Sequence, residues 1–315
     1  MADTLAQRLP EAVQHLLGRA LQASERIGIA VSGGADSMAL LALAARCWPG
    51  HVEAATVDHR LRADSAAEAA MVARWCENEG VPHAILTVAQ PLEGNLQAAA
   101  RAARYALLED WQQVRGLDWL MTAHQADDQL ETLVLRLNRG AGVAGLLAIR
   151  GRRGTLLRPL LNERRADLRA WCQRENVPFI DDPSNENQRF DRVRVRQALT
   201  GCDLIDPGGM NRALEALGEA EDAIAWMLDR LAAEHLVLAG DRADLTRTDL
   251  PPELLRRLIL RMVAHLNPQA EKPRGPSLDQ ALVQLFDGKT VTLADCLVTG
   301  GARWTMRRAP PRRSC

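Results

Sequence analysis

Long apolar runs are absent from this sequence of 315 residues. The longest, Met38 to Ala45, is far shorter than the ~20 residues that a membrane-spanning helix needs, so no membrane partner is expected. The N-terminal residues show no basic stretch followed by an apolar block, and a secretory signal is therefore not predicted. These absences predict a cytoplasmic protein.

Closely spaced cysteines are also missing. The six cysteines include no CxxC pair, so a zinc ribbon, a redox motif and a cysteine-ligated cluster have no support in the sequence. Scattered single cysteines in a chain without an export signal predict reduced thiols in a reducing compartment.

Lysine is rare, because Lys272 and Lys289 are the only two in the sequence. A Walker-type phosphate loop requires Gly-Lys-Ser/Thr, so that class of nucleotide site is excluded. The net charge of −1 gives no global basicity of the kind that many nucleic-acid-binding proteins have. The charge is uneven, however, since residues 136–196 hold 14 arginines against 7 acidic residues. This segment is a candidate phosphate-binding surface, and a solvated charged face is the alternative.

Short apolar segments alternate with longer amphipathic ones in the first half of the chain. Strands are predicted at residues 26–31, 52–58, 84–88 and 119–123, with helices at 37–47, 65–79, 95–115 and 127–138. This alternation predicts βαβ units and an α/β fold with a parallel, Rossmann-like sheet. Ligands of such sheets bind beyond the carboxyl ends of the strands, so the loops after Val31, Asp58 and Ala123 are the candidate site.

The pattern changes beyond about residue 150. Helices are predicted at 163–176, 211–236 and 252–266, a hairpin or loop at 150–158, and strands near 291–293 and 303–307. A chain of this length is expected to form two domains. We predict one domain over residues 1–204 and a smaller, mainly helical domain over 205–315.

The segment Ser32-Gly33-Gly34-Ala35-Asp36-Ser37 joins the first predicted strand to a helix. Adjacent glycines let the backbone approach an anion, and the free N–H groups of the helix start favour phosphate. Asp36 would repel phosphate, which makes sense if a divalent cation lies between them. A GxGxxG at Gly140, Gly142 and Gly145 follows a helix rather than a strand, so a bend is the better interpretation there.

The loop resembles the SGGxDS signature of the N-type ATP pyrophosphatases, and further segments resemble the tRNA(Ile)-lysidine synthetases. Val57 to Arg62 with Ser65 and Glu68 match their VDHxLRxxSxxE motif, and Asn95, Leu96, Gln97, Arg101, Arg104 and Tyr105 match NLQxxARxxRY. The AHxxDDQxET motif is matched by His124, Asp127, Asp128, Gln129, Glu131 and Thr132, and the RLxRGxG motif by Arg136 to Gly140. The chain departs from the family at Gln125, where His is frequent, and at residues 192–197, which lack the usual Asn and Pro.

The resemblance implies that residues 1–204 form the catalytic ATP pyrophosphatase domain and that residues 205–315 bind tRNA or substrate. It also implies a reaction and its partners. ATP, with Mg²⁺, would adenylate the C2 carbonyl oxygen of cytidine 34 in a tRNA(Ile) with a CAU anticodon. The amine of free L-lysine would then attack C2, and AMP would leave after pyrophosphate. The sequence permits a homodimer but carries no signal for one.

Roles follow for individual residues. We expect ATP at Ser32, Gly33, Gly34, Ala35, Asp36, Ser37, Asp58, His59 and His124, with Asp36 also holding the metal. We expect catalytic roles for Asp36, Asp128, Glu131 and Arg196, and substrate contacts for Arg101, Arg104, Asp127, Arg139 and Arg192. The carboxylates at 128 and 131 share one helix face and suit a lysine ammonium, although helix-start carboxylates also complement the dipole.

Three other functions remain alternatives. A tRNA 2-thiolation enzyme would need CxxC cysteines, which are absent. A GMP or asparagine synthetase would carry a glutaminase domain or partner. A catalytically inactive nucleotide- or RNA-binding module would not need Asp36, Asp128 and Glu131 intact.

Overall fold

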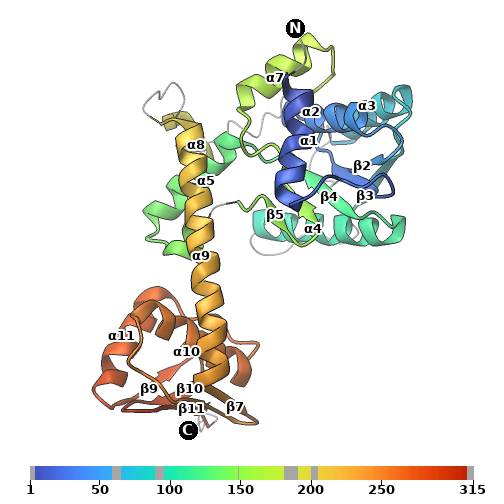
Figure 1. Cartoon of the computed structure of the whole chain (residues 1–315). Coiled ribbons are helices and arrows are strands. Elements are labelled where there is room, and N and C mark those ends of the chain that lie inside the picture. Colours follow the sequence, from blue (N-terminus) through green and yellow to red (C-terminus); the bar gives the residue numbers. More distant parts are fainter. Residues whose placement is uncertain are drawn as a thin grey trace. The chain divides into compact units, whose positions relative to one another are not determined.

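The computed structural model of the chain describes residues 4–58, 65–88, 96–147, 149–180, 191–199 and 205–310. The chain divides into two compact units, Met1–Leu217 and Gly218–Cys315 (Figure 1). This division falls within a single helix, α9 (Pro207–His235), whereas the boundary predicted at residue 204 lies outside the described residues. Within the described ranges, no helix is long and apolar enough to cross a membrane.

The first unit is built on a six-stranded sheet with the strand order β3-β2-β1-β4-β6-β5. Its strands are β1 (Ile27–Ala30), β2 (Val52–Asp58), β3 (His83–Thr87), β4 (Trp119–Thr122), β5 (Arg152–Arg153) and β6 (Leu156–Leu157). All neighbouring strands pair in parallel except β5 and β6, which form an antiparallel hairpin. The predicted parallel α/β sheet is confirmed, and the predicted hairpin at 150–158 is part of it.

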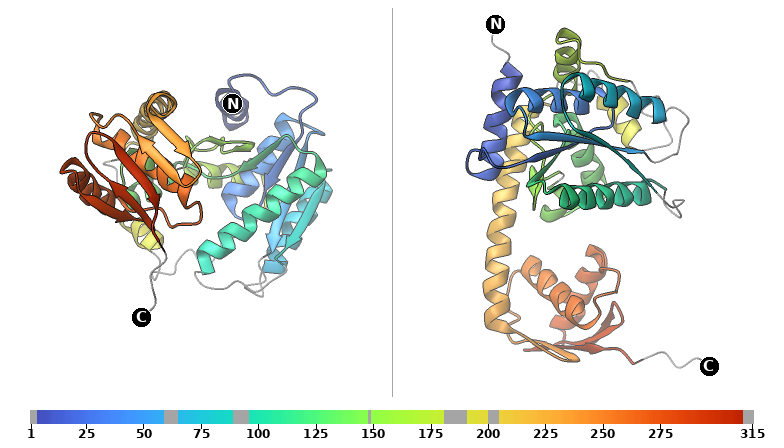
Figure 2. Two further views of the ribbon diagram at one scale, coloured as in Figure 1. Left: turned by 90° about the horizontal axis from the view of Figure 1, so that it is seen from below. Right: turned by 90° about the vertical axis from the view of Figure 1, so that its right-hand side faces the viewer.

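Helices cover both faces of this sheet (Figures 1 and 2). The helices of this unit before α9 are α1 (Thr4–Leu17), α2 (Ala35–Cys47), α3 (Ser65–Asn78), α4 (Leu96–Arg115), α5 (Ala126–Asn138), α6 (Val143–Leu146), α7 (Arg165–Arg174) and α8 (Asp191–Leu199). The apolar residues 38–44 of α2 are all buried, and they share one core with α1, α3, α7 and the first face of the sheet. The opposite face packs against α4 through Leu108 and Trp111.

Gly28 explains how closely α4 approaches the sheet. A Cβ atom at this position of β1 would lie 2.6 Å from the Trp111 ring and 2.9 Å from Leu117. A larger residue would push α4 away from the sheet, so the glycine sets the distance between these two layers.

The second unit combines helices with an antiparallel sheet of strand order β7-β8-β11-β10-β9. Its elements after α9 are β7 (Leu236–Ala239), β8 (Arg242–Leu245), α10 (Pro252–Leu266), α11 (Gly275–Phe286), β9 (Thr290–Leu293), β10 (Cys296–Thr299) and β11 (Trp304–Arg308). Figure 1 shows α10 and α11 on one face of this sheet, and their apolar side chains form one core with it. The strands predicted near 291–293 and 303–307 are present as β9 and β11, and the sheet adds three more.

Candidate functional site

The loop between β1 and α2 has the geometry expected of a phosphate loop. Gly33 has a φ of +84°, in the left-handed region that glycine adopts readily, and Gly34 is the N-cap of α2. The Ser37 hydroxyl donates to the Gly34 carbonyl oxygen at 2.9 Å and lies 3.2 Å from the Ser32 hydroxyl. The first N–H groups of α2 have no intrahelical acceptor. These N–H groups and the hydroxyls of Ser32 and Ser37 can therefore donate hydrogen bonds to a bound anion.

Asp36 stands in the first turn of α2, directly after this loop. Its Oδ1 atom is buried and has no hydrogen-bond partner, while Oδ2 lies 3.8 Å from Nε of Arg165. Burial raises the pKa of Asp36 to about 6, although the nearby Arg165 charge opposes this shift. A buried carboxylate oxygen without a partner can bind a cation or accept a hydrogen bond from a bound molecule.

The residues suit Mg²⁺ without forming a complete cage for it. Among the described residues, no group of three His, Cys, Asp or Glu side chains could hold a metal ion. Magnesium is usually held by one or two carboxylates together with substrate phosphates, so the single carboxylate of Asp36 beside a phosphate loop fits this cation.

Gln125 positions the acidic start of α5 beside the phosphate loop. Its side-chain oxygen accepts hydrogen bonds from the backbone N–H groups of Asp127 and Asp128, and the Asp128 carboxylate accepts one from the Gln125 N–H at 3.3 Å. This reciprocal capping box fixes where α5 begins. The departure from the family pattern at position 125 therefore has a structural role as the cap of α5.

Glu131 lies at the centre of a group of arginines. Its side chain is only 2% exposed, and its carboxylate oxygens accept hydrogen bonds at 2.7 Å from Nε of Arg192 and from Nε of Arg196. Burial raises the pKa of Glu131, but the hydrogen bonds from Arg196 and Arg192 outweigh it, so the pKa is lowered. The carboxylate is held ionised and fully paired.

Asp128 shares these partners. Its Oδ1 atom lies 2.8 Å from Nη2 of Arg192 and 3.4 Å from Nη2 of Arg165. Burial raises the pKa of Asp128, while the charges of Arg192 and Arg165 lower it, and the raised direction prevails. Asp128 thus makes hydrogen bonds with fewer arginines than Glu131, which contacts Arg165, Arg192 and Arg196.

Arg165 connects these carboxylates and was not predicted as a site residue. Its guanidinium lies within 3.8 Å of Asp36, 3.4 Å of Asp128 and 3.3 Å of Glu131. Its backbone N–H donates to Asp127 Oδ2 at 2.8 Å, and Arg164 lies 3.3 Å from the other oxygen of the same carboxylate. We call the eight residues Asp36, Asp127, Asp128, Glu131, Arg164, Arg165, Arg192 and Arg196 the charged cluster. The arginine-rich stretch 136–196 was the available signal for Arg164 and Arg165.

His124 follows β4 on the side of the sheet where the phosphate loop follows β1. Its Nδ1 lies 3.0 Å from the Thr122 hydroxyl. Burial lowers the pKa of His124 to about 3, helped by the charges of Arg158, Arg101, Arg104 and Arg192. The imidazole is therefore neutral at physiological pH and lies in a positive field that suits a phosphate.

Arg101 and Arg104 project from α4 toward Tyr105. Their guanidinium carbons lie 5.1 Å and 5.5 Å from the centre of the Tyr105 ring. Arg158, which was not predicted as a site residue, is 6% exposed; its Nη1 donates to the Arg150 carbonyl oxygen at 2.7 Å, and its Nε has no hydrogen-bond partner among the described residues. These cations all contribute to the field at His124.

The remaining predicted residues are not in the charged cluster. Asp58 ends β2, which pairs in parallel with β1, so it lies at the same edge of the sheet as the phosphate loop. Arg139 is exposed at the end of α5 and lies 3.7 Å from Asp191. His59 lies outside the described residues.

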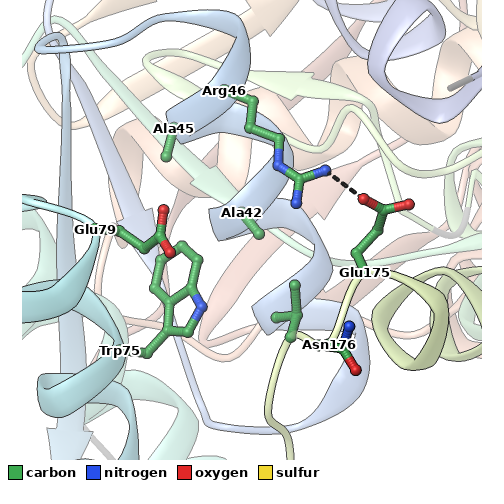
Figure 3. Close-up of a pocket in the computed structure, with 8 residues that line it drawn as sticks. Ala42, Ala45, Arg46, Trp75, Glu79, Glu175 and Asn176 are labelled. Carbon is green, nitrogen blue, oxygen red and sulfur yellow. Dashed lines mark hydrogen bonds and ion pairs between the residues drawn. The ribbon is translucent and has the colours of Figure 1, made fainter.

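A small cavity elsewhere in this unit is not part of the site (Figure 3). It has a volume of about 140 Å³ and is lined by Trp75, Glu79 and the Arg46–Glu175 ion pair. Its lining includes Ala42, which stands six residues after Asp36 in α2. At 1.5 Å per residue this separation is roughly 9 Å along the helix, and no residue of the phosphate loop lines the cavity.

The chain is similar to known proteins along nearly its whole length. A family model described as a PP-loop domain matches residues 1–202. Two curated relatives are both named tRNA(Ile)-lysidine synthase. The protein of Zymomonas mobilis subsp. mobilis is 41% identical over 313 residues, which cover 96% of this chain and 94% of the relative. The protein of Novosphingobium aromaticivorans is 42% identical over 306 residues, which cover 94% of this chain and 93% of the relative.

A solved structure shows the same fold at much lower sequence similarity. The U34-tRNA thiolase NcsA from Methanococcus maripaludis, solved with its 4Fe-4S cluster, superposes with a TM-score of 0.58 over 70% of this chain and 80% of that chain. The identity is 16%, so this likeness concerns the fold alone. The four cysteines in the described residues, Cys47, Cys76, Cys172 and Cys296, are scattered along the chain.

Proposed function

Because the chain belongs to the tRNA(Ile)-lysidine synthase family, we propose that it ligates free L-lysine to C2 of cytidine 34 in a tRNA(Ile) with a CAU anticodon. ATP is cut to AMP and pyrophosphate in this reaction. The observation that carries the proposal is the charged cluster, in which Asp36, Asp128 and Glu131 converge on Arg165 beside a phosphate loop.

The phosphate loop serves the first half of the reaction. The N–H groups of α2 and the hydroxyls of Ser32 and Ser37 bind the phosphates of ATP, and Asp36 holds Mg²⁺ against them. Mg²⁺ held there would neutralise phosphate charge and so make pyrophosphate a better leaving group. Arg192 and Arg196 stabilise charge on the α-phosphate while the cytidine oxygen is adenylated.

The carboxylates serve the second half. A lysine side chain is a cation, and Asp128, Glu131 and Asp127 are the acidic groups beside the phosphate loop that can accept it. Asp128 receives it first, because fewer arginines compete for its oxygens than for those of Glu131. The neutral His124, in a field of arginines, binds a phosphate or the base of the RNA. All of these residues come from one chain, so the proposal requires no second copy.

Labelled lysine tests this function directly. The protein is incubated with ATP, Mg²⁺, labelled lysine and a folded tRNA(Ile) transcript bearing CAU, and label in the RNA is measured. Incorporation that depends on ATP is expected from the native protein and is expected to fall below ~1% in Asp36→Asn, because each lost group of this kind costs about 10²–10³ in rate.

Asp167→Asn is the matched control, since Asp167 is also an acidic residue in the first turn of a helix but is exposed. It should retain native incorporation. No incorporation by the native protein would refute the proposal and favour an inactive RNA-binding module.

A further inference from the structure

Arg165 is a cation placed where the proposed function requires two others. Its guanidinium lies 3.8 Å from Asp36, 3.4 Å from Asp128 and 3.3 Å from Glu131. In the proposed function, Asp36 holds Mg²⁺, while Asp128 and Glu131 accept the ammonium group of lysine. Guanidinium and ammonium groups carry the same charge and donate hydrogen bonds to the same carboxylate oxygens. Lysine therefore competes with Arg165 for its binding groups.

Arg165 is held more weakly than the two other arginines on these carboxylates. Nε of Arg192 and Nε of Arg196 each lie 2.7 Å from a Glu131 oxygen, whereas the shortest contact between the Arg165 guanidinium and a carboxylate of the described residues is 3.3 Å. Charge-assisted hydrogen bonds of this kind are usually about 2.7–2.9 Å long, so the contacts of Arg165 are weak ones. Its side chain is also 31% exposed, and water can solvate the guanidinium once it leaves. Arg165 is thus the arginine that a new cation displaces most easily.

The first turn of α7 is an unfavourable place for an arginine. Arg164 is the N-cap of this helix and Arg165 is its first residue. Both cations lie at the positive end of the helix dipole, where a positive charge is destabilising, and Asp167 is the acidic residue of this turn. A residue that conflicts with the local preference of its helix is expected at functional sites. The charge of Arg165 is therefore better explained by its carboxylate contacts than by the stability of α7.

The backbone before α7 is held independently of the Arg165 side chain. The N–H of Arg165 donates to Asp127 Oδ2 at 2.8 Å, and the Glu163 carbonyl oxygen accepts a hydrogen bond from the Ala126 N–H at 2.9 Å. The Glu163 carboxylate accepts two hydrogen bonds from Arg8, at 2.8 and 2.6 Å. The Arg165 side chain can therefore leave the carboxylates while the start of α7 keeps its position against α5.

We propose that Arg165 is an internal competitor of lysine, whose guanidinium pairs with Asp128 and Glu131 until the ammonium group of lysine displaces it. This inference deepens the proposed function and rests on it, since that function names lysine as the cation. Before lysine binds, Arg165 keeps two poorly solvated carboxylates paired, and such charges are destabilising without a partner. Part of the binding free energy of lysine is then used to separate Arg165 from them, which weakens the binding of free lysine. Arg165 thus determines how tightly the site binds its amine.

Isothermal titration calorimetry of free L-lysine into the full-length chain, without ATP or tRNA, measures this competition. Arg165→Gln removes the charge but keeps a polar side chain, and it should lower Kd for lysine about tenfold, within the usual range for coupling between two adjacent groups. Arg165→Lys retains a competing cation and should bind lysine with a Kd close to that of the native chain. The charge at position 165, rather than the shape of the side chain, then sets the affinity.

Arg174→Gln is the matched control. Arg174 lies at the other end of α7, is 60% exposed and pairs with Glu175 at 3.0 Å. The same loss of charge on the same helix, outside the charged cluster, should leave Kd for lysine at its native value.

Urea unfolding supplies a second measurement on the same variants. Without lysine, Arg165→Gln should be less stable than the native chain, because Asp36, Asp128 and Glu131 lose a cation that they share. At one fixed lysine concentration, the variant should gain more stability than the native chain gains, since a ligand with a lower Kd gives the larger shift. A purely structural role for Arg165 predicts the opposite for lysine, because a damaged site would bind it less tightly.

A Kd for lysine that was unchanged or raised in Arg165→Gln would overturn the inference, and so would weaker binding in both Arg165→Gln and Arg165→Lys. The proposed function would stand in either case, provided that the native chain still incorporated lysine into tRNA. If the native chain neither bound lysine nor incorporated it, the proposed function would fail and the inference would fail with it.

Discussion

Asp36 shows how a residue with an energetic cost in the folded chain can mark a binding site. Its Oδ1 atom is buried and unpartnered, while the side chain as a whole is half-buried, and its pKa is raised to about 6. The folded state therefore binds this proton more tightly than the unfolded chain does. The ionised form lowers the stability of the empty protein, and a bound cation would reverse this effect.

We predict that Asp36→Asn stabilises the protein in metal-free buffer at pH 8. The carboxyl pKa rises from an ordinary value near 4 to about 6, so the ionised form costs up to about 3 kcal/mol on folding. The cost develops as pH rises from about 4 through 6, and it is absent below the unfolded pKa. Urea unfolding at several pH values measures the gain in free energy of unfolding of the variant over the native protein. This gain should be full above pH 6.5 and nearly lost at pH 4. An advantage that did not change with pH would contradict this account.

Individual residues were predicted from the sequence only where a motif named them. The phosphate loop, Asp128, Glu131, Arg192 and Arg196 were predicted in this way, and the last four meet in the charged cluster. Arg165 was not, because its role depends on contacts with Asp36, 129 residues earlier, which no local pattern contains. The assigned chemical roles stay predictions.

At the scale of elements, the start of α5 depends on a single buried side chain. Gln125 is fully buried. Its side-chain oxygen holds the first turn of α5 by accepting hydrogen bonds from the backbone N–H groups of Asp127 and Asp128. A shift of this turn would move Asp127 and Asp128 together, away from Arg164 and Arg165.

Gln125→Ala should therefore lower the free energy of unfolding by at least about 1 kcal/mol, the usual loss for an N-cap. It should also raise KM for lysine, since Asp128 loses its anchor. Chemical denaturation and steady-state kinetics measure the two effects. Arg274→Ala serves as the control, because the Arg274 N-cap makes no side-chain capping bond. Native stability in Gln125→Ala would show that the cap is dispensable.

The sequence predicted the helices and parallel strands of the first unit well, because apolar periodicity and glycine stops are local signals. It did not predict β7 and β8. The apolar pattern of α9 continues into Leu236, so the strand β7 follows the helix without a break in the sequence. β7 pairs with β8, and β8 pairs with β11, about 60 residues later in the chain, so contacts distant in the sequence decide that this segment becomes sheet.

On the scale of the whole molecule, each unit has a hydrophobic core of its own. Leu258 belongs to the core of the second unit and Leu40 to that of the first, and both are fully buried. Separate cores predict separate unfolding transitions, since cooperativity depends on shared packing.

Leu258→Ala should lower the melting temperature of one calorimetric transition and leave the other unchanged. A buried Leu→Ala substitution costs about 2–5 kcal/mol, which is several degrees for a unit of this size. ATP binding should persist in the variant while tRNA affinity falls. Leu40→Ala should shift the other transition, and a single transition that moved as a whole in both variants would disprove the independence of the cores.

The charged cluster has a further consequence for the order of events at the site. It contains four carboxylates and four guanidinium groups, so it presents charges of both signs in equal number. A polyanion can enter by taking over arginines, which releases carboxylates from their partners. The released carboxylates are then the ones available to an ammonium group. In the proposed reaction, binding of ATP would thus create the binding site for lysine. The same cluster would bind an anion first and a cation second.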